Sequence, residues 1–392
     1  MITKNINFVQ EGVLRILHIG LLSHFTEGMT YQDNMLTDIH CLDGNEVLYV
    51  SDNRIFVNGK LVEVPEEKLT LNNSLQLIRV KYDKVINSFV SKKIQKVTSL
   101  KNIIYTFKPD KILYHGVCGS ELITVAGYKK NHPDIKLYVD CHADFHNTAK
   151  TLISKIAYKY IHGYFIKQAL PYIDKIFYVT PESKEYLQKM YKIDENLMEW
   201  FPLGGIVFDD ENYHQKRSIK RAELGLKKGD ILFIHSGKMD ISKKTIDILI
   251  AFSKVKSPNF RLAIIGAFQE SIWEIAKTYI NSDKRIVFLG WKNADELLSY
   301  LCAADIYIQP GTQSATMQNA LCCRCGVLVY PYPSYISLIK ENGFFIKNSQ
   351  DIENVLRQIQ KTPKIIGVMK KKSEFMSKKF LDYKIIAKRI YL

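Results

Sequence analysis

The chain has 392 residues, of which 46% are hydrophobic and 24% are charged, with 20 Gly and 11 Pro. This length favours two domains, and the composition is typical of a soluble globular protein and excludes a disordered or collagen-like chain. The 55 Lys and Arg outweigh the 40 Asp and Glu to give a formal charge of +15, which favours an anionic partner: nucleic acid, a phospholipid surface or a phosphate-bearing substrate.

The sequence predicts neither a targeting signal nor a membrane span. Apolar runs such as Val13–Leu22 are much shorter than the roughly 18 residues that a membrane-spanning helix needs. The residues Met1 to Asn7 lack the basic start, apolar middle and small cleavage residues of a secretory signal. The seven Cys are scattered and odd in number, which predicts buried thiols in a reducing compartment. We therefore expect a cytoplasmic protein.

In the first half of the chain, short β-rich runs alternate with longer stretches of helical period, as in parallel sheets covered by helices. The predicted strands are Val13–Leu22, Glu46–Val50, Lys111–His115, Lys136–Asp140 and Lys175–Val179. The predicted helices are Val90–Phe107, Ser120–Lys130 and Thr148–Leu170. The segment Pro202–Arg221 changes character, with two Gly and an acidic polar run, and predicts the connection between two domains.

The second half repeats the alternation. Its predicted strands are Ile231–His235, Arg261–Ile265, Arg285–Leu289, Asp305–Gln309 and Val327–Tyr330. Its predicted helices are Thr245–Val255, Glu270–Ile280, Ala294–Cys302 and Ala315–Cys323. The pattern predicts an α/β protein of two Rossmann-like, doubly wound domains, residues 1–205 and 206–365, facing across a cleft in which ligands bind. Residues 366–392 predict a basic helix that packs back toward the N-terminal domain.

A glycine followed by lysines comes directly after the first strand of the second half. Ser236-Gly237-Lys238 ends this strand, and Lys243-Lys244 follow just before a helix. A Gly turn lets the backbone approach a ligand closely, and cations at a strand-to-helix loop suit a diphosphate. Lysines near strand ends are also common without any ligand.

A second candidate anion site follows the strand Asp305–Gln309. The loop Pro310-Gly-Thr-Gln leads into a helix, so the amides of Ser314, Ala315 and Thr316 are predicted to be free at its positive end. The alternative is an ordinary helix cap at Ser314.

The order and spacing of these motifs resemble the donor-binding half of GT-B glycosyltransferases, and of glycosyltransferase family 4 in particular. The resemblance implies that Lys238 and Lys243 grip the diphosphate of a nucleotide-sugar donor, with Lys244 able to take the role of Lys243. It also implies that Gly266 borders the same pocket and that Trp291 and Lys292 meet the nucleobase.

Motifs of the first domain extend this resemblance. Glu27-Gly28 resembles the Gly loop that reaches the donor phosphate, and Tyr138-Val-Asp-Cys-His142 resembles the strand that ends in a His near the transferred sugar. His142 is therefore the expected sugar contact, and the nearby Asp144 and His146 are candidates for the acceptor side. His24 and His115, at other strand ends, are weaker candidates.

One departure from family 4 concerns its usual pair of glutamates. Ser314 stands at the first Glu position, and Asn319 replaces the second. A neutral amide forms weaker hydrogen bonds with ribose hydroxyls than a carboxylate does. This departure leaves open a catalytically inactive GT-B relative, or a nucleotide-sugar epimerase, that acts as a binding or partner protein.

The resemblance implies a glycosyltransferase of hexosyltransferase type, acting with retention. Because no Asp-x-Asp motif occurs, we expect no metal and no cofactor besides a UDP- or GDP-linked sugar as co-substrate. Lys238, Lys243 and the amides of residues 314–316 would then stabilise the leaving nucleoside diphosphate. The implied acceptor is a hydroxyl of a glycan or lipid-linked oligosaccharide, in bacterial surface polysaccharide synthesis (O-antigen or capsule).

Other functions have less support. No helix-turn-helix, aromatic RNA-binding signature or zinc module favours nucleic acid, and no pair of carboxylates favours a glycoside hydrolase. The segment Thr148–Leu170 mixes Lys with aromatics at helical spacing, which fits either a protein core or an anionic membrane surface. From Lys361 to Leu392, ten basic and two acidic residues leave a net charge of +8. Together these segments suggest a peripheral location on the inner face of the cytoplasmic membrane.

Overall fold

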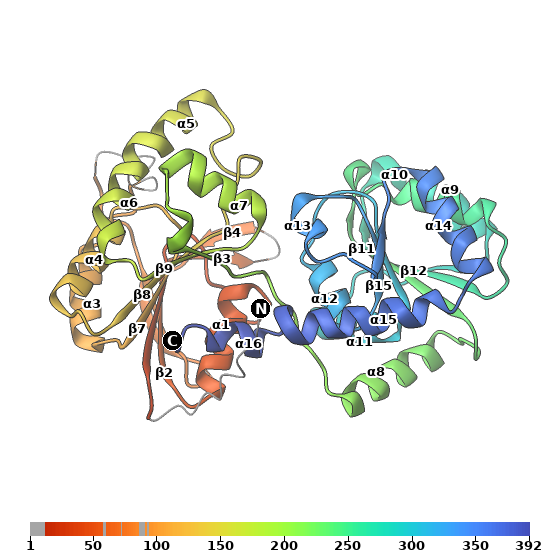
Figure 1. The fold of residues 1–392 in the computed structure, drawn as a ribbon, viewed down its shortest axis with the longest axis horizontal. Coiled ribbons are helices and arrows are strands. Elements are labelled where there is room, and N and C mark those ends of the chain that lie inside the picture. The colour runs from red at the N-terminus through yellow and green to blue at the C-terminus, as the bar shows by residue number, and fades with distance from the viewer. Residues whose placement is uncertain (1–11, 58–59, 72, 86–90, 92–93) are drawn as a thin grey trace. The chain divides into compact units, whose positions relative to one another are not determined.

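The structure is a computed structural model that describes residues 12–57, 60–71, 73–85, 91 and 94–392. Contacts divide the chain into two compact units (Figure 1). Unit 1 comprises Met1–Pro202 together with Ile386–Leu392, and unit 2 comprises Leu203–Ile385. Two predictions concern residues outside this range: that residues 1–7 are not a secretory signal, and that a helix starts at residue 90.

Unit 1 contains an eight-stranded sheet of order β10-β9-β8-β7-β1-β2-β6-β5, parallel except where β5 pairs with β6. The strands are β1 (Arg15–Gly20), β2 (Glu46–Asp52), β5 (Glu67–Thr70), β6 (Gln76–Val80), β7 (Lys111–His115), β8 (Lys136–Cys141), β9 (Lys175–Tyr178) and β10 (Met198–Trp200). A separate antiparallel pair joins β3 (Arg54–Val57) to β4 (Lys60–Glu63). The five predicted strands are confirmed, because their continuous apolar runs are buried between covering helices.

Helices cover both faces of this sheet (Figure 1). They are α1 (Gln32–Leu42), α3 (Ser99–Phe107), α4 (Glu121–Asn131), α5 (Leu152–Ala157), α6 (Gly163–Ala169) and α7 (Pro181–Tyr186). The predicted helix Thr148–Leu170 is confirmed as a continuous helical stretch, which begins after the cap Thr151 and runs through α5, a π-helical turn (Tyr158–His162) and α6. The predicted helix Val90–Phe107, by contrast, is too long. Gln95 has a left-handed φ of 58°, and the regular helix α3 begins at Ser99.

Unit 2 contains a six-stranded, fully parallel sheet of order β13-β12-β11-β14-β15-β16. The strands are β11 (Ile231–Met239), β12 (Phe260–Phe268), β13 (Ile286–Phe288), β14 (Ile306–Gln309), β15 (Gly326–Val329) and β16 (Gly343–Phe345). The helices are α8 (Asp210–Glu223), α9 (Thr245–Lys254), α10 (Glu270–Ser282), α11 (Ala294–Ala303), α12 (Thr316–Cys322), α13 (Pro333–Ile336), α14 (Ser349–Lys361) and α15 (Ile365–Met376). Figure 1 shows α9, α10 and α14 on one side of this sheet and α11 and α15 on the other. The predicted α/β class with two doubly wound domains is therefore confirmed.

The predicted connection Pro202–Arg221 is wrong over most of its length. Asp209 accepts a hydrogen bond from the amide of Asn212 and thereby caps α8. This helix packs against α11, and its Arg217 forms a 2.6 Å ion pair with the buried Asp305. The linker is therefore shorter than the polar composition of the segment suggested.

The C-terminal segment differs from the single basic helix predicted for residues 366–392. Helix α15 belongs to unit 2, where Ser373 Oγ donates to the carbonyl of Cys325 at 2.6 Å. After a π-helical turn, Ser377–Leu381, the short helix α16 (Tyr383–Lys388) follows. Within the last residues, which belong to unit 1, Arg389 donates to the carbonyl of Trp200 at 2.6 Å. Among the described helices, none is both long and apolar enough to cross a membrane.

Candidate functional site

Glycines occupy the carboxyl edge of the unit 2 sheet at three neighbouring strands. Gly237 in β11 and Gly266 in β12 are register partners, and the Gly266 amide donates to the carbonyl of Gly290 at 2.8 Å. Gly266 has a φ of 142°, and a Cβ added there would lie 1.8 Å from the Gly237 carbonyl oxygen. This edge therefore presents backbone rather than side chains, which lets a flat ring or a phosphate approach closely.

Lys243 lies beside this edge. Its side chain passes over Gly237, where an added Cβ would be 3.5 Å from Lys243 Cε, and its Nζ lies 3.4 Å from the Thr312 carbonyl oxygen. Burial lowers the pKa of Lys243 despite the nearby Asp240 carboxylate. Within the described residues Lys243 pairs with no carboxylate, so a half-buried ammonium here is electrostatically suited to an anionic ligand.

Packing of two loops creates this arrangement. The Thr312 amide donates to the carbonyl of Ser242 at 3.1 Å, and a Cβ added to Gly311 would lie 2.1 Å from the same oxygen. The loop after β14 is thereby held against the loop after β11. As a result, Lys243 and Thr312, 69 residues apart, share one place at the sheet edge.

The other predicted cations differ in their surroundings. Lys238 is exposed on the last part of β11. Lys244 points elsewhere, because its Nζ donates to the Lys347 carbonyl at 2.8 Å and lies 5.4 Å from the centre of the Tyr330 ring. Lys292 Nζ lies 3.8 Å from Glu296 on α11. Trp291, 64% exposed, leaves its ring available to a ligand.

The prediction of free amides at residues 314–316 is wrong for two of the three. The Ser314 amide donates to the Tyr335 hydroxyl at 2.9 Å, and the Thr316 amide donates to Ser314 Oγ at 3.2 Å. The alternative, a cap at Ser314, fits this contact better: Ala315 directly precedes α12, but Ser314 Oγ accepts the amide of its first residue, Thr316. Asn319, in α12, faces the backbone of Gly205, where an added Cβ would lie 2.7 Å from Asn319 Oδ1.

In unit 1, His142 follows β8 and its Nε2 lies 3.7 Å from Asp140 Oδ2. The His142 side chain is 42% exposed, whereas that of Asp140 is 1% exposed. Although desolvation opposes it, the Asp140 carboxylate raises the pKa of His142. Asp140 also accepts from the Gly116 amide at 2.9 Å and from His115 Nδ1 at 2.6 Å. The exposed imidazole of His142 therefore lies beside the buried carboxylate of Asp140, which two other hydrogen bonds hold in place.

Two histidines that lie behind His115 were not predicted from the sequence. His115 Nε2 lies 3.0 Å from His18 Nδ1, and His18 Nε2 lies 3.0 Å from His40 Nδ1. All three rings are buried. Three histidines without any common motif gave no signal in the sequence, since they come from β1, α1 and β7.

The remaining unit 1 candidates lie in loops. Asp144 Oδ1 accepts from the amides of His146 and Asn147 at 2.7 and 2.8 Å, so this carboxylate shapes its own turn, and His146 is exposed. Gly28 is exposed with a φ of 73°. His24 Nδ1 lies 3.0 Å from the buried Asp52, a His–Asp pair at the ends of β1 and β2. In the described part of the chain, no group of three or more His, Cys, Asp or Glu is arranged to hold a metal ion.

Comparisons with known proteins agree with this architecture. Residues 216–372 match the family model described as glycosyl transferases group 1. No curated protein matches the sequence. Three solved structures superpose on nearly all of the chain at 14% identity. They are HepE from Anabaena with UDP (TM-score 0.67, 96% of this chain and 98% of that chain), sucrose-phosphate synthase from Thermosynechococcus elongatus (0.65, 96% and 97%) and WaaG, a glycosyltransferase involved in lipopolysaccharide biosynthesis (0.59, 96% and 99%).

The similar structures have two Rossmann-like domains, as this chain has, and the matched family segment contains the glycine edge and Lys243. Residues 216–372 therefore form a domain of the glycosyl transferases group 1 type within a chain that has the GT-B fold.

Proposed function

We propose that the protein is a glycosyltransferase that moves a hexosyl group from a UDP- or GDP-linked sugar to a hydroxyl of a glycan or lipid-linked oligosaccharide. The observation that carries this proposal is the Lys243 ammonium, half-buried beside a glycine edge and without a carboxylate partner among the described residues. A diphosphate supplies the missing negative charge, and the glycine edge leaves room for it. HepE, of similar fold, was solved with UDP and with UDP-glucose, which supports a nucleotide-sugar donor.

In this proposal catalysis is mainly electrostatic and needs no metal. Lys243 and the exposed Lys238 stabilise the charge that develops on the leaving nucleoside diphosphate. His142 contacts the transferred sugar, and the acceptor hydroxyl attacks from the leaving-group face with retention of configuration. Similarity in fold to WaaG supports a place in bacterial surface polysaccharide synthesis (O-antigen or capsule).

Nucleotide binding tests the proposed donor site. We expect UDP or GDP, without metal, to raise the melting temperature, because a ligand of the folded state stabilises by mass action. We expect Lys243→Ala to weaken binding about 10- to 100-fold, the effect of losing a charge-assisted contact worth about 1.5–3 kcal/mol. Differential scanning fluorimetry across UDP, GDP, ADP and CMP, followed by titration calorimetry, measures both.

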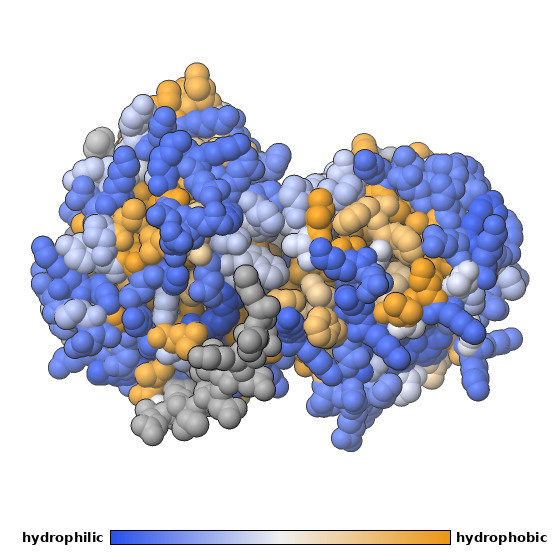
Figure 2. Space-filling model, viewed as in Figure 1, coloured by the Kyte–Doolittle hydropathy of each residue, from blue (hydrophilic) through white to orange (hydrophobic). Residues whose placement is uncertain are grey.

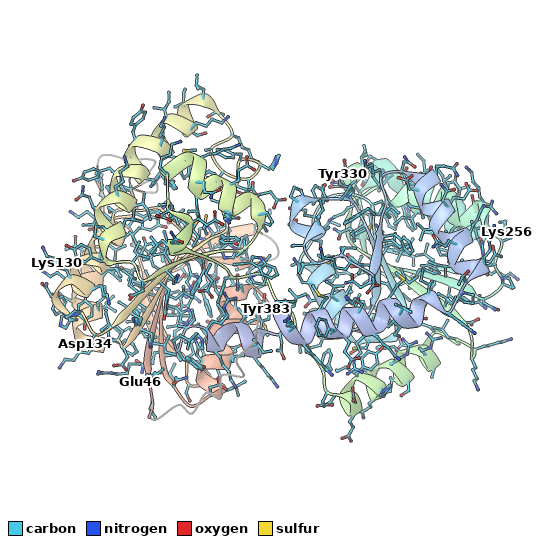
Figure 3. The ribbon with its side chains drawn as sticks, viewed as in Figure 1. Glu46, Lys130, Asp134, Lys256, Tyr330 and Tyr383 are labelled. Carbon is cyan, nitrogen blue, oxygen red and sulfur yellow. The ribbon has the colours of Figure 1, made fainter. Side chains whose placement is uncertain are left out.

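Lys256→Ala provides the matched control. Lys256 is exposed and lies far from Tyr330, which follows β15 at the carboxyl edge of the sheet (Figure 3). Its removal should leave nucleotide affinity unchanged. If no nucleotide stabilises the wild type, the donor assignment fails. Nucleotide binding without sugar transfer would instead favour the alternative function, an inactive relative or a nucleotide-sugar epimerase. The replacement of the usual second Glu by Asn319 leaves this alternative open.

We further propose that unit 1 binds an anionic membrane surface through α5 and the turn after it. Three apolar side chains of α5 face solvent, with Leu152 74%, Ile153 81% and Ile156 51% exposed. Figure 2 shows a hydrophobic tip at the end of unit 1 where α5 lies. Four exposed lysines lie in or beside this segment, at positions 150, 155, 159 and 167. Apolar side chains among lysines suit insertion between anionic headgroups.

Vesicle sedimentation tests this membrane surface. At low salt we expect the protein to bind vesicles that contain phosphatidylserine. Ile153→Glu should reduce the bound fraction at least about tenfold, because it replaces an apolar side chain that inserts into the membrane with a charged one. Leu42→Glu is the matched control, since Leu42 is equally exposed (79%) on α1. Equal binding by both variants, or none by the wild type, would contradict the proposed surface.

A further inference from the structure

A continuous chain of buried hydrogen bonds leads from Asp140 to the C-terminal residues of unit 1. Asp140 Oδ2 lies 2.6 Å from His115 Nδ1, and separations of 3.0 Å link His115 to His18 and His18 to His40. His40 Nε2 lies 3.1 Å from the carbonyl oxygen of Ala387. The residues come from β8, β7, β1, α1 and the C-terminal segment, which lies beside α1 in Figure 1.

The carbonyl at the end of this chain sets the direction of every hydrogen bond in it. A carbonyl only accepts, so His40 Nε2 carries a hydrogen and donates it to Ala387. Burial lowers the pKa of His40 to about 4 and that of His18 well below its usual value, so both rings are neutral. Neutral His40 therefore accepts at Nδ1 from His18 Nε2, and neutral His18 accepts at Nδ1 from His115 Nε2.

His115 donates from both of its ring nitrogens and is therefore an imidazolium. Its Nε2 hydrogen goes to His18, and its Nδ1 hydrogen goes to Asp140. Although burial opposes the charge, Asp33 (3.5 Å away) and Asp140 raise the pKa of His115 to about 9. Asp33 in turn accepts from the Tyr49 hydroxyl at 2.7 Å, so the groups around the cation are satisfied.

The imidazolium of His115 sets how Asp140 acts on His142. Asp140 is held as a carboxylate by His115 and the Gly116 amide, and its Oδ2 also lies 3.7 Å from His142 Nε2. Asp140 thus favours a hydrogen on His142 Nε2 and orients the ring. The positive charge of His115 opposes a second charge on His142 and limits the rise in its pKa.

This chain of hydrogen bonds cannot carry protons to solvent through Ala387, because a backbone carbonyl takes up no proton. It can only fix the orientation and the charge of the side chains that belong to it. We propose that His115, His18 and His40 are positioning residues that act through Asp140 to hold His142 in one tautomer and one orientation. The consequence for sugar transfer rests on the proposed function, whereas the hydrogen-bond directions do not.

Imidazole nitrogen NMR on the wild-type protein tests the directions without any substrate. At pH 7 we expect neutral His18 and His40 with hydrogen on Nε2, and His115 with hydrogen on both nitrogens. The groups that face these rings are Asp33, Asp140, His142, Tyr49, Asp43 and Tyr391. The opposite tautomer at His18 or His40, or a neutral His115, would overturn the proposal.

Variants of His18 then test the effect on His142. His18→Leu removes the acceptor for the Nε2 hydrogen of His115, so the pKa of His115 should fall and that of His142 should rise. His18→Asn keeps an acceptor near the former Nδ1 and should restore the wild-type titration. In the transferase assay His18→Leu should lower kcat about 10- to 100-fold, the range for losing an outer hydrogen-bond partner, with KM for the nucleotide sugar unchanged.

His235→Leu is the matched control, since His235 is equally buried but lies in unit 2, between the Ile308 carbonyl and Thr245 Oγ1. It should leave the titration of His142 unchanged. An unchanged titration in folded His18→Leu, or identical titrations in the Leu and Asn variants, would overturn the positioning role. An inactive wild type with the expected NMR pattern would instead count against the proposed function alone.

Discussion

Replacing Gly266 with alanine is expected to lower the free energy of unfolding of unit 2 by at least about 4 kcal/mol and to abolish nucleotide binding. An added Cβ would lie 1.8 Å from the Gly237 carbonyl oxygen and 2.8 Å from the Gly237 carbonyl carbon. Neither atom can move without separating β11 from β12, which pair over nine residues. The φ of 142° adds strain for any residue with a Cβ.

The control for this substitution is Gly225→Ala. Gly225 also has a positive φ, 62°, but no atom lies within 4 Å of an added Cβ. Only the left-handed conformation then opposes alanine, which costs about 1–2 kcal/mol. Urea unfolding of the two variants separates strain from steric overlap. Equal losses in both would show that the backbone of β11 and β12 relaxes to admit a Cβ at residue 266, contrary to this prediction.

The parts of the fold that were predictable from sequence are those with long apolar runs. All five strands predicted in unit 2 form, because a parallel strand covered on both faces must be apolar throughout. Strands β3 and β4 escaped prediction because their side chains are mostly exposed or half-buried and include Arg54, Lys60 and Glu63. Helix α8 escaped because its stability depends on distant partners, such as Asp305 for Arg217, rather than on an apolar stripe.

The candidate site, too, could be predicted only where the residues that form it are close together in the sequence. Gly237 and Gly266 lie near the ends of their strands, and Lys243 follows β11 within a few residues, so the motif alone indicated an anion site at the sheet edge. The occupied amide of Ser314 was not predictable, because its acceptor Tyr335 is 21 residues away. The hydrogen-bonded histidines were not predictable for the same reason, because His18 and His115 are 97 positions apart in the sequence.

Replacing Asp305 with asparagine should be the most damaging change of a single charge in unit 2. The carboxylate side chain is 9% exposed and pairs with Arg217 at 2.6 Å, Arg221 at 3.1 Å and Lys370 at 3.3 Å. It also accepts from the Leu232 amide at 2.9 Å. An amide leaves these cations without their counter-charge, so we expect a loss of about 3–5 kcal/mol in the free energy of unfolding.

The pH dependence of stability identifies the cause of that loss. Although burial alone raises it, Arg217 and its neighbours hold the pKa of Asp305 below its usual value in the folded protein. The stabilisation is therefore complete above the pKa in the unfolded chain, about 3.9, and is lost as the pH falls through the lower folded pKa. Asp305→Asn should flatten this acid decline in urea unfolding measured between pH 5 and pH 2. Glu185→Gln, which breaks only the exposed pair with Lys189, should cost at most about 0.5 kcal/mol and leave the decline intact. A decline as steep in Asp305→Asn as in the wild type would mean that other carboxylates dominate acid unfolding of unit 2.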